Sequence, residues 1–163
     1  MNFALSQILG PHIRQAGSFL DSGRLRFDFT HQKALTELEI RNIEQLVQEK
    51  IDQNHPISTT LLPLAVAQKD TSIVQAFGEK YGSEVRVVNI QNVSRELCGG
   101  THAKTTGSIG LFRIVKESSI GNGIRRIEAC IGMQACEFMY KREDILHESV
   151  SYTHLTLPTS DLV

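Results

Sequence analysis

Hydrophobic and polar residues alternate most clearly in residues 24–29, where Leu25, Phe27 and Phe29 are separated by charged side chains. A period of two is typical of a β-strand that buries one face. The segment before it, Asp-Ser-Gly at 21–23, has the composition of a turn. Further strands are predicted at residues 85–90, 94–98, 110–117 and 123–129, with a loop at 121–123.

A helical period begins at Thr36, where Thr-Glu-Leu-Glu forms a capping box. Aliphatic residues then recur at helical spacing as far as Ile51, which predicts a helix that ends near residue 54. Residues 1–9 have the pattern of the end of a helix, which a Gly-Pro pair stops. Two more helices are predicted over residues 64–80 and 133–147.

The predicted order is a strand, two helices and then a run of strands. This order is typical of an α+β domain, with a mostly antiparallel sheet packed against helices on one face. A chain of 163 residues that is 40% hydrophobic is long enough for one domain with a hydrophobic core. The three cysteines are an odd number and indicate no disulfide framework. No signal peptide or membrane span is apparent, so we expect a cytoplasmic domain.

The net charge of −1 excludes a protein whose whole surface is basic, so any RNA contact must come from a local patch. Arg125 and Arg126 are candidates for phosphate contact, because arginines position nucleic-acid backbones. Neighbouring residues of a strand point to opposite faces, so we expect one arginine at most to reach RNA. The other is expected to pair with an acid such as Glu128, and a salt-bridged surface is the alternative for both. Further candidates are Lys104, Arg113 and Lys116.

The sequence Glu-Leu-Cys-Gly-Gly-Thr-His at 96–102 is the main candidate for chemistry. Thiolate and imidazole are good zinc ligands, and the two glycines allow the loop to bring Cys98 and His102 to one ion. Two ligands do not complete a zinc site, which usually has three or four from the protein. The alternative is a buried cysteine beside a loop histidine. Cys130 and Cys136 are interpreted as small apolar residues of the core.

This motif resembles that of the editing domain of alanyl-tRNA synthetases and their free-standing relatives, within the superfamily of the threonyl and alanyl tRNA synthetase second additional domain. The resemblance covers about residues 1–132 in the family's order and spacing, and residues 133–149 are expected to begin the helix that follows. The segments that carry it are 14–18, 24–29, 77–81, 85–88, 96–102, 107–112 and 123–129.

The resemblance implies a zinc site in which two histidines of a His-x-x-x-His helix join Cys98 and His102. That pair is absent from this sequence, and Met1 corresponds to a position just past its second histidine. We therefore expect a truncated N-terminal helix, weak or absent zinc binding and poor activity in the chain as given. His12 and His31 do not occupy the missing positions and are interpreted as surface or core residues.

The resemblance also implies an editing pocket beside the metal. Its polar groups suit the hydroxyl of a seryl group or the attacking water. The alternative for residues 15–18 is a plain turn before the strand at Leu25. The residues assigned to substrate binding or catalysis are Gln15, Gly17, Ser18, Gly99, Gly100 and Thr101.

The implied reaction is hydrolysis of the ester that joins serine or glycine to tRNA for alanine. An aminoacylation pocket sized for alanine rejects these two amino acids poorly, and a second, hydrolytic site corrects the resulting errors. The implied partners are the acceptor end of that tRNA and the rest of the synthetase chain, which also holds the ATP site. One alternative is a threonyl-tRNA synthetase type of editing domain, which usually has Arg and Pro where Gly100 and Thr101 stand. Others are a non-catalytic tRNA-binding module and an incomplete gene.

Residues 150–163 continue neither the helical pattern nor the charge pattern that precede them. They resemble the in-frame translation of a transposase-type sequencing adapter. We interpret them as a non-native tail that makes few contacts with the domain. The alternative is a natural extension that packs against it.

Overall fold

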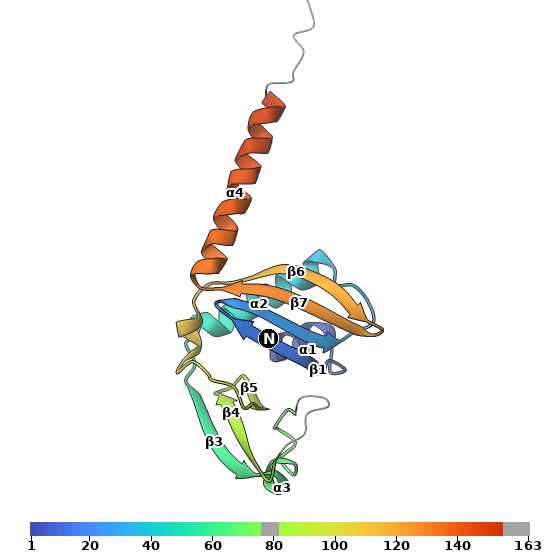
Figure 1. Ribbon diagram of the computed structural model, residues 1–163, viewed down its shortest axis with the longest axis vertical. Helices are drawn as coiled ribbons and strands as arrows, with labels where there is room; N and C mark the ends of the chain where they lie inside the picture. Colours follow the sequence, from blue (N-terminus) through green and yellow to red (C-terminus); the bar gives the residue numbers. More distant parts are fainter. Residues whose placement is uncertain (76–81, 155–163) are drawn as a thin grey trace, which may run out of the picture.

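The computed structural model describes residues 1–75 and 82–154, with side chains up to residue 149. It contains two antiparallel sheets, and a long helix, α4 (Met133–His154), projects from the larger one (Figure 1). The combination of helices and antiparallel strands confirms the predicted α+β class. The single sheet expected from the sequence is, however, two sheets.

The larger sheet has the strand order β1-β2-β7-β6, and α1 (Asn2–Leu9) and α2 (Glu37–Asp52) pack on one of its faces (Figure 1). Its strands are β1 (Gln15–Asp21), β2 (Arg24–Thr30), β6 (Phe112–Gly121) and β7 (Ile124–Ile131). The largest fully buried side chains of the molecule lie between this sheet and these helices. They are Phe29, Leu5, Ile13, Ile43 and Ile127.

Strand β2 lies in the centre of this sheet and pairs with β1 and β7. Phe27 and Phe29 are buried and Leu25 is half-buried, which confirms the buried face predicted from their alternation. The hairpin from β1 to β2 turns at Ser22 and Gly23, which both have positive φ. This is the left-handed conformation that two-residue hairpin turns require, and it suits the predicted turn composition.

Helix α2 begins at the capping box that the sequence predicted. The Glu39 amide donates to the Thr36 hydroxyl, and the Glu39 carboxylate accepts from the Thr36 amide at 2.7 Å. Both groups occupy the first turn, where free amides otherwise lack partners. The helix buries Ile43 and Ile51 toward the sheet and ends at Asp52, close to the predicted position.

The smaller sheet has the order β3-β4-β5 and its own hydrophobic cluster. Its strands are β3 (Ile57–Pro63), β4 (Glu84–Ile90) and β5 (Ser94–Leu97), and a short helix, α3 (Leu64–Ala67), follows β3. Side chains alternate across each strand, so one face of β4 contributes to this hydrophobic cluster and the other faces the larger sheet. The cluster consists of Ala67, Ile73, Val85, Val87 and Leu97.

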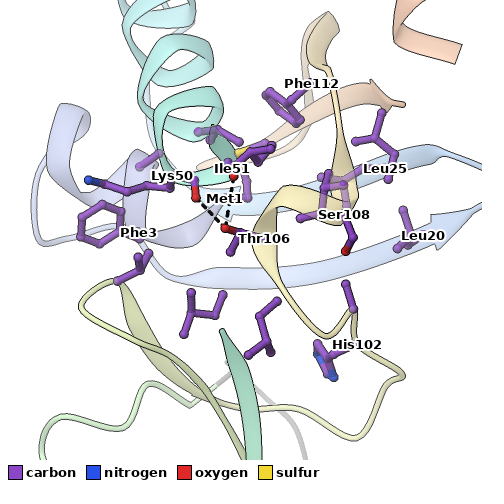
Figure 2. Close-up of a pocket in the computed structure, with 18 of the residues that line it drawn as sticks. Met1, Phe3, Leu20, Leu25, Lys50, Ile51, His102, Thr106, Ser108 and Phe112 are labelled. Carbon is purple, nitrogen blue, oxygen red and sulfur yellow. Dashed lines mark hydrogen bonds between the residues drawn. The ribbon is translucent and has the colours of Figure 1, made fainter. Parts of the chain in front are cut away.

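Thr106 connects the two sheets at the start of the short helix η1 (Thr106–Ile109). Its buried hydroxyl donates to the Lys50 carbonyl at 2.7 Å and accepts from the His55 amide at 2.9 Å. Figure 2 shows this hydroxyl directed at the last turn of α2. The segment that follows the smaller sheet is thereby tied to the C-terminal end of α2.

The helix predicted over residues 64–80 is wrong for most of its described part. Helix α3 ends at Ala67, and a turn follows in which the Asp70 carboxylate accepts from the Ser72 amide at 3.0 Å. Aspartate and serine compete in this way with helical hydrogen bonds. Val74 then pairs with β5 as an isolated bridge. Residues 76–80 of the predicted helix lie outside the described residues.

Two unpredicted strands and the end of one helix also differ from the expectation. Strands β1 and β3 were not predicted, and both lie at a sheet edge. Helix α4 runs to His154, past the predicted end at 147, so the backbone of residues 150–154 continues the helix. The rest of the predicted tail lies outside the described residues. None of the helices within the described residues has the length and apolar character of a membrane span.

Candidate functional site

The Cys-Gly-Gly-Thr-His loop leaves the smaller sheet at the end of β5 and runs toward η1. Its first residue is held by the sheet, because the Cys98 amide donates to the Arg86 carbonyl of β4 at 3.1 Å. Its far end is held where the Ile57 amide donates to the Lys104 carbonyl at 2.9 Å. The loop therefore bridges β3 and β5 on the side of the smaller sheet that faces the rest of the molecule.

The Arg86 side chain also reaches this loop. Its Nε donates to the Cys98 carbonyl at 3.0 Å, and its Nη2 donates to the Gly100 carbonyl. The sequence interpretation missed this residue. The available signal was weak, since a single arginine in a valine-rich strand usually marks a solvated position.

The electrostatic surroundings of His102 favour its neutral form. Burial lowers the pKa of this imidazole and the positive charge of Arg86 lowers it further, while a hydrogen bond with the Gly100 backbone and the charge of Glu96 oppose the shift. A neutral imidazole is the form that coordinates a metal ion.

A cavity of about 420 Å³ lies between the two sheets, beside the loop. Figure 2 shows His102 on one side of it and Phe3 and Lys50 on the other. Its lining is mainly apolar and combines distant parts of the chain. Representative residues are Met1 before α1, Leu20 and Leu25 from the β1-β2 hairpin, Ile57 and Ile90 from the smaller sheet, and Thr101.

The predicted pocket residues separate into two groups. Thr101 and His102 line the cavity, with Gly99 and Gly100 in the same loop. Gln15, Gly17 and Ser18 lie on edge strand β1, where the Gln15 amide donates to the Ser18 hydroxyl at 3.1 Å. These three residues are not among the described residues that line the cavity. Their contact with substrate stays a prediction.

Arg125 and Arg126 each form an ion pair within the larger sheet. Arg126 makes two bonds to Asp28, with Nε–Oδ1 at 2.7 Å and Nη2–Oδ2 at 2.8 Å. Arg125 holds Glu117 in the same bidentate way, with Nη2–Oε2 at 2.6 Å, and both side chains are largely buried. Glu128, the partner expected from the sequence, takes part in neither ion pair. Contact of either arginine with tRNA stays a prediction.

Cys98 and His102 supply donors of the right kind for zinc, but two donors do not complete a zinc site. Within residues 1–75 and 82–149, no group of three or more His, Cys, Asp and Glu side chains is placed to hold a metal ion. His12 and His31 pair with each other, with Nε2 and Nδ1 3.0 Å apart. Cys130 is buried, and burial raises the pKa of its thiol, in line with its interpretation as a core residue.

Residues 85–128, which include the loop and most of the strands around it, match the profile of a family described as threonyl and alanyl tRNA synthetase second additional domain. This match covers 44 of the 163 residues of the chain. Similarity to known proteins extends beyond these residues to most of the chain. The chain is 47% identical over 146 residues to an alanine–tRNA ligase of Petrotoga mobilis, 48% over 146 residues to one of Lachnoclostridium phytofermentans, and 46% over 148 residues to one of Thermotoga maritima.

These alignments cover 90% or 91% of this chain but only 16% or 17% of each ligase. The chain therefore spans about one sixth of the length of the relatives that it matches.

Proposed function

We propose that this chain is part of an editing domain that hydrolyses the ester joining serine or glycine to the 3′ end of tRNA for alanine, and that it is active only when a His-x-x-x-His helix completes its metal site. The proposal is supported by its similarity to alanine–tRNA ligases and carried by one structural observation. Met1 and His102 line the same cavity between the two sheets. A helix that continues on the N-terminal side of Met1 would enter next to the Cys98–His102 loop.

The cavity has the size and character of a small-ligand site. Its volume of about 420 Å³ falls within the range of such pockets, which are mostly apolar with few polar groups. The polar residues at this cavity are Thr101 and His102 from the loop, Thr106 and Ser108 from η1, and Lys50 from α2. An aminoacyl ester has a short side chain and a reactive carbonyl, so we assign the loop side of the cavity to the carbonyl.

Cys98 and His102 are the residues that would hold a zinc ion, with two further ligands supplied by a His-x-x-x-His helix. Bound zinc supplies Lewis acidity toward a carbonyl or a water molecule. The chain's own contribution is to keep His102 neutral through burial and to present both donors from one short loop. The rest of the cavity lining is mainly apolar.

The proposed partner is the acceptor end of tRNA for alanine, presented by the remainder of a synthetase chain. The surface that meets the phosphates includes Arg126 only if its pair with Asp28 opens. The alternatives are Lys104 near the loop and Lys116 on β6, which form no ion pair with another described residue.

Deacylation of seryl-tRNA tests the proposal. The chain extended by a His-x-x-x-His helix should hydrolyse seryl-tRNA of the alanine type, and an Ala-x-x-x-Ala extension is the matched control. Binding of the tRNA without hydrolysis in both extended forms would instead identify a non-catalytic tRNA-binding module.

A further inference from the structure

Arg86 contacts the Cys-Gly-Gly-Thr-His loop, but the proposed reaction gives this arginine no role. Strand β4 turns Val85 and Val87 into the hydrophobic cluster of the smaller sheet, so Arg86 points to the opposite face. The register of β4 and β5 pairs Val87 with Leu97, which places Arg86 beside Cys98. The arginine thus stands at the point where the loop leaves the sheet.

Three hydrogen bonds connect Arg86 to two residues of the loop. Its carbonyl accepts from the Cys98 amide, its Nε donates to the Cys98 carbonyl, and its Nη2 donates to the Gly100 carbonyl. Within the described part of the chain no carboxylate forms an ion pair with it. Its guanidinium is therefore committed to the backbone of the loop.

The loop itself has little stiffness between these two carbonyls. Gly99 and Gly100 have wide conformational freedom, and a Cβ added at Gly99 would meet no atom within 4 Å. A planar guanidinium has its donors in a rigid fork, so two bonds to carbonyls two residues apart fix the backbone between them. A lysine ammonium is a point charge on a flexible stem and cannot reproduce that geometry.

We propose that Arg86 is a positioning residue, whose guanidinium clamps the backbone at Cys98 and Gly100 and so sets the placement of the Cys98 and His102 side chains. This inference rests on the proposed function for its purpose, but the clamp itself is a property of this chain's own residues. Residues that orient metal ligands typically change metal affinity by 10- to 100-fold when they are replaced.

Alkylation of individual cysteines in the full chain tests the clamp without any metal. In Arg86→Gln and Arg86→Lys, Cys98 should react with iodoacetamide about tenfold faster than in the wild type, because neither side chain reproduces the forked bonds that hold the loop. Mass spectrometry resolves each site, so Cys136, on α4, serves as the internal standard. Arg95→Gln is the matched control, since Arg95 lies on β5 of the same sheet and pairs with Asp70 of the turn after α3.

Cobalt titration of the chain extended by a His-x-x-x-His helix then separates the two levels of the account. The Arg86→Lys variant should bind cobalt at least about tenfold more weakly than the wild type while its thermal unfolding midpoint stays close to the wild-type value. Unchanged Cys98 reactivity in Arg86→Lys, or faster reactivity with unchanged cobalt affinity, overturns the positioning role. Failure of the wild-type extended chain to bind cobalt contradicts the proposed function instead, and the alkylation result still decides the clamp.

Discussion

The guanidinium of Arg126 donates two hydrogen bonds to the carboxylate of Asp28 on the adjacent strand, at 2.7 and 2.8 Å. The two residues are direct cross-strand neighbours in the register of β2 and β7. Bidentate pairs of this kind are the stronger class of charged hydrogen bonds. The arginine that the sequence suggested for tRNA contact therefore has a structural partner within the sheet.

We predict that Arg126→Gln lowers the free energy of unfolding by about 1–2 kcal/mol, because it removes a partly buried bidentate pair. Arg41→Gln is the control, since Arg41 and Glu37 form an exposed pair at 3.6 Å that should contribute at most about 0.5 kcal/mol. Urea denaturation of the three proteins measures both. Equal effects of the two substitutions would show that the Arg126–Asp28 pair has no special role in the sheet.

The capping box of α2 gives a prediction about pH. The hydrogen bonds from the Thr36 amide and hydroxyl lower the pKa of Glu39. A carboxyl whose folded pKa is lowered contributes stability above its ordinary pKa, and this contribution is lost as the pH falls through the folded value. The wild type should therefore lose more stability in acid than Thr36→Ala, in which the hydroxyl bond is absent.

Thr36→Ala should also cost about 1 kcal/mol at neutral pH, as is usual for loss of an N-terminal cap. Urea denaturation of both proteins at neutral and acid pH measures the two effects together. An identical pH dependence in wild type and variant would contradict the account of Glu39.

The contact of Thr106 with α2 gives a prediction about the junction of the two sheets. Thr106→Val removes a buried hydroxyl and leaves the His55 amide and the Lys50 carbonyl without this partner. The loss should be about 1–3 kcal/mol, the usual cost of unsatisfied buried groups. Thr105→Val is the control, because the Thr105 side chain does not cap η1. A difference below about 0.5 kcal/mol between the two variants would show that water replaces the hydroxyl.

The elements that could be predicted are those whose own sequence determines them. Helix α2 has a capping box and an apolar face, and β2 has strict alternation because only one of its faces packs into the core. Strand β1 lies at an edge with most of its residues exposed, so it lacks a burial pattern. Strand β3 is mostly exposed too and begins just after Pro56. Their identity as strands depends on pairing with distant residues.

The same difference applies to the candidate site. Cys98 and His102 lie in one short motif, so their proximity follows from the sequence. The part played by Arg86 depends on the register between β4 and β5, and the cavity depends on how the two sheets face each other. Neither relationship has a local signature. The helix expected over 64–80 was wrong for residues 68–75, because the Asp70–Ser72 turn overrides the local apolar spacing.

The far end of α4 gives a prediction about the C-terminal residues. All residues from Tyr140 to Ser149 are exposed, and the helix projects away from both sheets (Figure 1). A chain that ends at Ser149 should therefore keep the thermal unfolding midpoint of the full chain. A fall of several degrees would show that residues 150–163 pack against the domain.

The central claim is that the Cys98–His102 loop and the cavity beside it form a site for editing mischarged tRNA. The most direct measurement compares hydrolysis of seryl-tRNA and alanyl-tRNA of the alanine type, by the chain extended with a His-x-x-x-His helix and loaded with zinc. We predict that the seryl ester is hydrolysed far faster, and that Cys98→Ala abolishes both the activity and the stoichiometric zinc. Equal rates on the two esters, or a preference for tRNA of the threonine type, would contradict the account.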